Sequence, residues 1–156
     1  MITFSFLFNL SYAQQATIIK FSDLNKQLSQ DNDTTYIFNF WATWCRPCVK
    51  ELPHFQEVDK KYAGSKVKVV LVSLDFKKSI AAVDSFLVAR KVSAPVFLLD
   101  EVNYNSWIDK VDTSWSGSIP ATLIINSKQH YRRFYEKEFK ADELIEAIDN
   151  AITYKQ

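Results

Sequence analysis

The chain has 156 residues, of which 47% are apolar, and this is enough for one domain with a buried core. The formal net charge is +1, so the composition lacks the basic footprint of a nucleic-acid-binding protein and the charge run of an acidic tail. Only 2 glycines are present, which excludes a low-complexity linker. We therefore expect a single globular domain whose function depends on a local site.

The N-terminus has the pattern of a secretory signal peptide. An apolar run from Ile2 to Leu10 is too short to span a bilayer, and small residues precede a possible cleavage point after Ala13. No Lys or Arg precedes the run, and a buried N-terminal strand is the alternative. We expect a signal peptide over residues 1–13. The mature domain, residues 14–156, would then be soluble in the periplasm or another exported compartment.

Hydrophobic periodicity and turn residues predict strands that alternate with helices. The expected strands are 18–21, 35–41, 67–74, 96–99, 121–126 and 131–135. The expected helices are 22–30, 45–64, 79–91 and a last helix from 141, with a helical turn at 104–110. This order predicts an α/β fold, a three-layer sandwich in which a central mixed β-sheet carries helices on both faces.

The second expected helix has apolar residues at helical spacing, including Cys48, Leu52 and Phe55. Its charged residues, Glu51 among them, are assigned to the opposite, polar face. Pro53 lies inside this helix and predicts a kink, because proline removes a backbone hydrogen bond there.

Cys45 and Cys48 are the only cysteines of the chain, and two residues separate them. A bridge between them would close almost no loop and would therefore add little stability. Cys45 follows a strand and opens a helix, where free N–H groups and the helix dipole lower a thiol pKa. Arg46 adds positive charge, and Pro47 suits the first helical turn. This arrangement favours chemistry over reinforcement.

Thiol–disulfide exchange requires a nucleophilic thiol and a second thiol that resolves the mixed disulfide. Cys48 lies one helical turn after Cys45, within reach for an intramolecular disulfide. Trp41 and Trp44 flank the pair, as an apolar rim or, for Trp41 in its buried strand, as core. Pro120 directly precedes a strand, and the residues alone leave its peptide bond cis or trans.

The stretch "FWATWCRPC", the proline eight residues after the first cysteine and "IPATLII" resemble the thioredoxin superfamily. The TlpA/ResA-like exported thiol–disulfide oxidoreductases match best, over about residues 18–153. The resemblance implies a thioredoxin-like fold with Cys45 as nucleophile and Cys48 as resolving cysteine. It also implies a cis Pro120 that helps to bind substrate backbone, with Ile119 before it tuning thiol reactivity.

The resemblance bears on four further features. Asn39 takes the place of the buried acid of thioredoxin itself, so that proton relay is absent. Asp75 matches an acidic residue that this group often carries after a strand, although a turn cap is the alternative. Trp115 borders the groove or simply packs. The long spacing from Cys48 to Pro120 resembles the strand–helix insertion of the group, within residues 75–114.

The function expected from these features is an exported enzyme that reduces protein disulfides, in cytochrome c maturation or envelope redox homeostasis. Its partners would be proteins with disulfides and a membrane electron donor, and the chain would be a monomer without nucleic acid. The redox-active Cys45–Cys48 disulfide would serve in place of a cofactor. The cysteines and the two histidines, His54 and His130, match no zinc spacing. An oxidase or isomerase, or a non-enzymatic binding module, are the alternatives.

Overall fold

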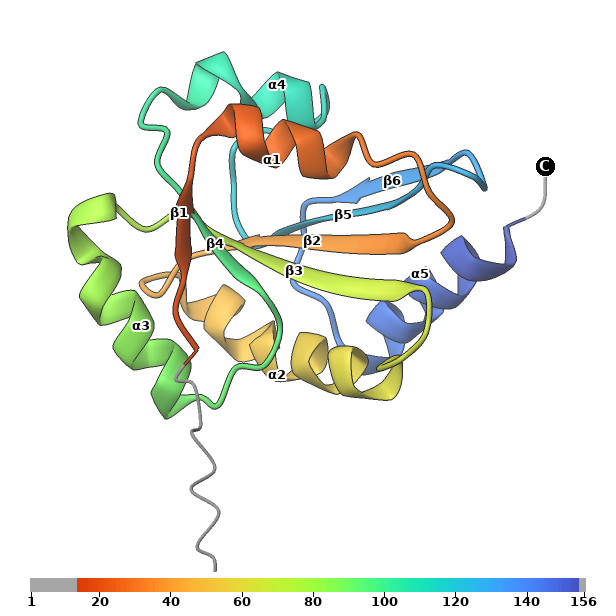
Figure 1. The fold of residues 1–156 in the computed structure, drawn as a ribbon, viewed down its shortest axis with the longest axis horizontal. Helices are drawn as coiled ribbons and strands as arrows, with labels where there is room; N and C mark the ends of the chain where they lie inside the picture. Colours follow the sequence, from red (N-terminus) through yellow and green to blue (C-terminus); the bar gives the residue numbers. More distant parts are fainter. Residues whose placement is uncertain (1–13, 155–156) are drawn as a thin grey trace, which may run out of the picture.

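The computed structural model describes residues 14–154 and contains one six-stranded mixed sheet, with the strand order β1-β4-β3-β2-β5-β6 (Figure 1). The strands are β1 (Thr17–Ile19), β2 (Thr35–Trp41), β3 (Val67–Ser73), β4 (Val96–Leu99), β5 (Ala121–Asn126) and β6 (Tyr131–Tyr135). The first four strands in this spatial order are parallel, and β5 and β6 are antiparallel to their neighbours. The predicted signal peptide lies outside the described residues.

Helices cover both faces of this sheet. The helices are α1 (Phe21–Leu28), α2 (Arg46–Lys61), α3 (Ile80–Ala89), α4 (Ile108–Val111) and α5 (Ala141–Thr153), with short 3-10 turns η1 (Lys77–Ser79) and η2 (Tyr104–Ser106). Helices α1 and α4 lie on one face, and α2, α3 and α5 lie on the other (Figure 1). The predicted α/β sandwich is confirmed. The predicted insertion corresponds to β4 and its flanking helices, with β4 placed between β1 and β3.

Strand β2 lies near the centre of the sheet and is buried along its whole length. Its side chains alternate between the two faces, as the strand geometry requires. Phe38 and Phe40 join the apolar cluster beneath α1 and α4, whereas Ile37 and Trp41 join the cluster beneath α2. Trp41 has no exposed surface, so it belongs to the core and not to an apolar rim.

Several element boundaries differ from the expectation. The first strand ends at Ile19 and not at residue 21, α1 ends at Leu28 and not at residue 30, and α3 covers Ile80–Ala89 and not 79–91. The first helix begins at Phe21 with Lys20 as its N-cap, not at Ser22, and the Lys20 carbonyl accepts a hydrogen bond from the Leu24 N–H (3.1 Å). The second helix ends at Lys61, before the expected Gly64. At the start of α1 and at the end of α2, the packing of the apolar helix face outweighs the preferences of individual residues for helix ends.

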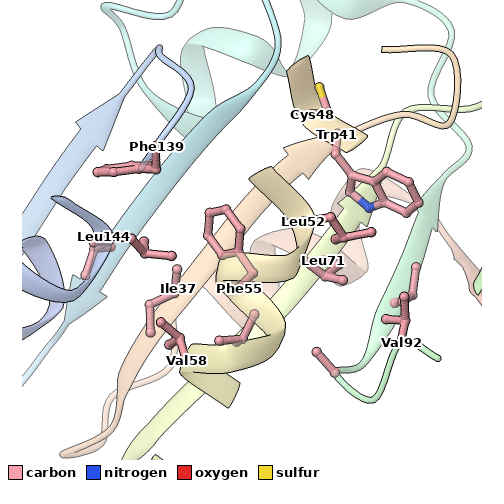
Figure 2. Packing of buried hydrophobic residues seen from close by; sticks show 14 of the residues in the cluster. Ile37, Trp41, Cys48, Leu52, Phe55, Val58, Leu71, Val92, Phe139 and Leu144 are labelled. Atoms are coloured by element: carbon pink, nitrogen blue, oxygen red, sulfur yellow. The ribbon is translucent and has the colours of Figure 1, made fainter. Parts of the chain in front are cut away.

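The larger apolar cluster fills the space between the sheet and α2, α3 and α5. Leu52 and Phe55 on α2 pack with Ile37 on β2 and Leu144 on α5, and each is at most 2% exposed (Figure 2). Cys48 belongs to the same cluster and is fully buried. The beginning of α2 is therefore anchored in the core by one of the two cysteines.

The assignment of Glu51 to a polar helix face is wrong. Glu51 is a fully buried residue of α2, and its two carboxyl oxygens accept hydrogen bonds from Asn39 Nδ2 (2.8 Å) and from the Phe139 N–H (2.7 Å). Asn39 also donates to Thr122 Oγ1 (3.2 Å) on the neighbouring strand β5. Hydrogen bonds make the burial of this polar side chain tolerable, because an unpaired buried carboxyl group would be far more costly.

Burial raises the pKa of Glu51 from 4.5 to about 7, because the charged form loses its hydration. The hydrogen bonds from Phe139 and Asn39 act in the opposite direction, and the nearby charge of Glu138 adds to the increase. In the folded chain Glu51 therefore holds its proton at pH values where an unfolded chain releases it.

This difference predicts a pH-dependent loss of stability. As pH rises from 4.5 through about 7, the folded state binds more protons than the unfolded state, so the free energy of unfolding falls. We expect Glu51 to contribute a fall of up to about 3 kcal/mol over this window, and Glu51→Gln to abolish this contribution. Urea denaturation between about pH 4 and pH 8 measures the difference between the two proteins. Parallel stability curves for both would contradict the prediction.

Candidate active site

The redox pair sits where β2 passes into α2. Cys45 is the N-cap residue of α2, and its Sγ accepts a hydrogen bond from the Cys48 N–H at 3.3 Å. The two sulfur atoms form a disulfide with an S–S distance of 2.07 Å. Pro47 lies in the first turn of the helix, where its missing N–H has no structural cost. The helix N-terminus directs its positive end at Cys45, which favours a thiolate there after reduction.

The two cysteines differ in their access to solvent. Cys45 is 6% exposed and Cys48 is not exposed at all. Around them Arg46 is exposed, and Trp44 presents 64% of its surface to solvent. A disulfide in another protein can therefore approach Cys45 but not Cys48, which agrees with the roles of nucleophile and resolving thiol.

A buried carboxylate holds the connection that carries Cys45. Asp75 follows β3 and is only 4% exposed. Its oxygens accept hydrogen bonds from the Thr43 N–H (2.9 Å), the Thr43 hydroxyl (2.6 Å) and the Ser73 hydroxyl (2.8 Å). Thr43 stands two residues before Cys45, so Asp75 ties the active-site connection to the end of the neighbouring strand. These bonds join two segments, so Asp75 is more than the turn cap that was the alternative.

The second side of the site is the segment before β5. The Ile119–Pro120 peptide bond is cis, as the resemblance implied. The Ile119 carbonyl oxygen lies 3.7 Å from Cys45 Sγ. This segment therefore brings main-chain atoms against the nucleophilic sulfur, although it is more than seventy residues away along the chain.

Trp115 precedes this segment and is 4% exposed. It packs against Phe40, Trp107 and Phe134 at ring-centroid distances of 4.7, 5.5 and 5.4 Å. Its indole N–H donates a hydrogen bond to the Ser118 carbonyl at 2.8 Å. Of the two interpretations of Trp115, packing is the one that fits its buried ring. The indole N–H also bonds the segment that leads to Ile119.

An open groove of about 380 Å³ lies next to Cys45. It is lined by Trp44, Leu74, Tyr104, Asn105, Ile108, Ser116, Gly117 and Ile119. These residues come from the active-site connection, from the end of β3, from the inserted segment around η2 and α4, and from the turn before the cis peptide bond. Most of its lining side chains are apolar, and two lining residues reach Cys45: Trp44 precedes it in the chain, and the Ile119 carbonyl lies 3.7 Å from its Sγ.

The structure thus brings together Cys45, Cys48, Trp44 and the Ile119–Pro120 segment. Trp41 and Asn39 lie below the site in the core, where Asn39 binds Glu51. Sequence reasoning missed Glu51, although its position three residues after Cys48 on one helix face was a usable signal.

Two further residues escaped the sequence reasoning. Thr43, in the segment between β2 and α2, donates a hydrogen bond to Asp75. Glu136 accepts one from the turn before Ile119. Neither has a local sequence signal, because each contact joins segments that are distant along the chain.

Within residues 14–154, no group of 3 or more His, Cys, Asp or Glu side chains is arranged to hold a metal ion. In the same part of the chain, no helix is both long enough and apolar enough to cross a membrane.

Comparison with known proteins gives a consistent result. Residues 8–133 match the sequence profile of the AhpC/TSA family. Thiol-disulfide oxidoreductase ResA of Oceanobacillus iheyensis is 39% identical over 70 residues, which cover 45% of this chain and 35% of that protein. Thiol-disulfide oxidoreductase ResA of Bacillus subtilis is 28% identical over 131 residues, which cover 77% of this chain and 69% of that protein. The chain therefore spans only about a third of the first relative.

Among solved structures, a thioredoxin-related protein from Neisseria meningitidis serogroup B superimposes with a TM-score of 0.66. It is 28% identical in sequence, and the match covers 80% of this chain and 88% of that protein. The family profile extends over most of the described residues, including both cysteines and the cis peptide bond. The chain belongs to the AhpC/TSA family and has its thioredoxin-like fold.

Proposed function

We propose that the chain is a thiol–disulfide oxidoreductase that reduces disulfides in proteins through Cys45 and Cys48. The observation that carries this proposal is the geometry of the pair: an accessible sulfur at a helix N-terminus, joined to a buried sulfur one turn later. The groove beside Cys45 supports a polypeptide substrate. The two relatives named thiol-disulfide oxidoreductase ResA support the same reaction class.

The reaction starts from the reduced pair. The Cys45 thiolate attacks one sulfur of the substrate disulfide, so that a mixed disulfide forms and the other substrate sulfur leaves as a thiolate. Cys48 then loses its proton and attacks Cys45 Sγ, which releases the second substrate thiolate. The substrate gains two electrons, and the chain is left with the Cys45–Cys48 disulfide seen in this structure. A dithiol on an electron donor must return the two electrons.

The setting we propose is an exported one. Residues 1–13 have the signal-peptide pattern, and the resemblance to the TlpA/ResA-like exported group is the basis for a reductant in cytochrome c maturation or envelope redox homeostasis. The relatives named thiol-disulfide oxidoreductase support the reaction class alone. The donor would be a membrane protein, and the chain would act as a soluble monomer. The same pair could run in the other direction as an oxidase or isomerase, because the potentials of such pairs range from about −270 to −120 mV.

The order of attack predicts which single cysteine variant traps a partner. We expect Cys48→Ala to accumulate a mixed disulfide between Cys45 and insulin, because the resolving thiol is missing. A mass shift equal to one insulin chain, reversed by dithiothreitol, measures it. Cys45→Ala is the matched control and should trap far less, since Cys48 is fully buried. Equal trapping by both variants would contradict the assigned roles.

The direction of electron flow predicts the reduction potential of the Cys45–Cys48 pair. We expect a value below about −200 mV, toward the reducing end of the range for such pairs. Equilibration of the protein in glutathione or dithiothreitol redox buffers, with the thiols counted by alkylation, measures it. A value near the oxidising end would favour the oxidase. A wild-type chain that neither reduces insulin nor yields a trapped adduct would favour a non-enzymatic binding module.

A further inference from the structure

The turn before the cis peptide bond has a demanding geometry. Ser116 and Gly117 line the groove beside Cys45, and Ser118 leads directly into Ile119. Gly117 has a φ of +95°, which favours glycine, and a Cβ at this position would lie 3.3 Å from Ile108 Cδ1. The Ser116–Ser118 turn therefore forms one wall of the groove, and it needs external contacts to keep this shape on an exposed surface.

Glu136 supplies these contacts from a point just beyond β6. One of its carboxylate oxygens accepts a hydrogen bond from the Ser118 N–H at 2.9 Å and another from the Ser116 hydroxyl. The second oxygen accepts from the Ser116 N–H at 3.1 Å. Hydrogen bonds to a charged acceptor are stronger than neutral ones, so a single side chain fixes both ends of the turn.

The other side of the turn is held from the core. The buried Trp115 donates its indole N–H to the Ser118 carbonyl at 2.8 Å. Ser118 is therefore fixed through both its N–H and its carbonyl, by Glu136 and by Trp115. Burial opposes the ionisation of Glu136, but the hydrogen bonds from Ser116 and Ser118 outweigh it and lower the pKa of the carboxyl group. The acceptor thus stays charged at neutral pH.

We propose that Glu136 is a positioning residue for protein substrates: it holds the Ser116–Ser118 turn and, through it, the Ile119 main chain against Cys45. This inference rests on the proposed reductase function. The Ile119 carbonyl lies 3.7 Å from Cys45 Sγ, so displacement of the turn moves the groove wall and the main chain beside the nucleophile together. A polypeptide substrate must contact this surface, whereas a small disulfide needs only Cys45 Sγ.

The proposal predicts a loss that depends on the size of the substrate. Glu136→Gln replaces one acceptor oxygen with an NH₂ group, which faces a donor instead of accepting from it. We expect kcat/KM for insulin reduction to fall about tenfold, mainly through KM, on the scale of a lost charge-assisted hydrogen bond. The rate with the small disulfide dithionitrobenzoic acid should fall by a much smaller factor.

Two further variants and one independent measurement complete the test. Ser116→Ala removes the hydroxyl donor and should give a smaller loss of the same kind, even where Glu136→Gln fails to fold. Glu146→Gln removes a charge from an exposed position on α5 and should change neither rate. Amide hydrogen exchange should become faster at Ser116 and Ser118 in Glu136→Gln, because each of these N–H groups donates to the carboxylate.

Three results would overturn the role of Glu136. These are equal losses on both disulfides in Glu136→Gln, no loss on insulin, and unchanged amide exchange in the turn. A wild-type chain that reduces neither disulfide would instead refute the proposed function. An active wild type with an unaffected Glu136→Gln would refute only the role of Glu136, so the two failures are distinguishable.

Discussion

The site depends on the fixed junction between the end of β2 and the first turn of α2. The Trp41 carbonyl accepts the Leu74 N–H at 2.8 Å, and the Ala42 carbonyl accepts the Cys45 N–H at 3.1 Å. Between these bonds Asp75 holds Thr43 through its N–H and its hydroxyl. Ala42, Thr43 and Cys45 are thus tied to the sheet or to their neighbours, whereas the Trp44 side chain is exposed. Because this junction is fixed, Cys45 stays at the helix N-terminus, where its thiolate is stabilised.

The core beneath this junction contains a group that reduces stability at neutral pH. Glu51 places an ionisable carboxyl group in the core one turn after Cys48, where its oxygens accept from Asn39 Nδ2 and the Phe139 N–H. Its pKa of about 7 means that it takes up and releases a proton close to neutral pH. Departures from simple core packing concentrate at functional sites, and the position of Glu51 next to the buried cysteine fits that pattern.

The strands were predictable because their signals are local. The segments Thr35–Trp41, Val96–Leu99, Ala121–Asn126 and Tyr131–Tyr135 have the bounds that their apolar and β-branched residues indicate. The cysteine pair was equally predictable. A bridge across two residues closes almost no loop, so its spacing favours thiol–disulfide exchange over a stabilising role. It was harder to predict from the sequence which of Trp41 and Trp44 lines the groove, because this depends on the residue at which β2 ends.

The features that stayed hidden depend on contacts between distant segments. Glutamate is usually a surface residue, so the sequence predicts an exposed Glu51. Only the fold brings Asn39 and the Phe139 N–H next to its carboxyl group. Glu136 likewise looks like an ordinary charged residue in "YEKEFK" until β6 is paired with β5. A sequence pattern cannot show such contacts, because the partners lie 12 to 88 residues apart.

Two acidic side chains hold main chain near Cys45 in a similar way. Asp75 accepts the N–H of Thr43, two residues before the nucleophile, and Glu136 accepts the N–H of Ser118, one residue before Ile119. Both accept hydrogen bonds from main-chain N–H groups, one in the connection that leads to Cys45 and one in the turn that leads to Ile119. Hydroxyl groups complete each set of donors, from Thr43 and Ser73 for Asp75 and from Ser116 for Glu136. Glu136 therefore holds the groove wall that contains Ser116 and Gly117, and Tyr104 and Ile108 of the inserted segment line the same groove without a contact to either carboxyl group among the bonds described.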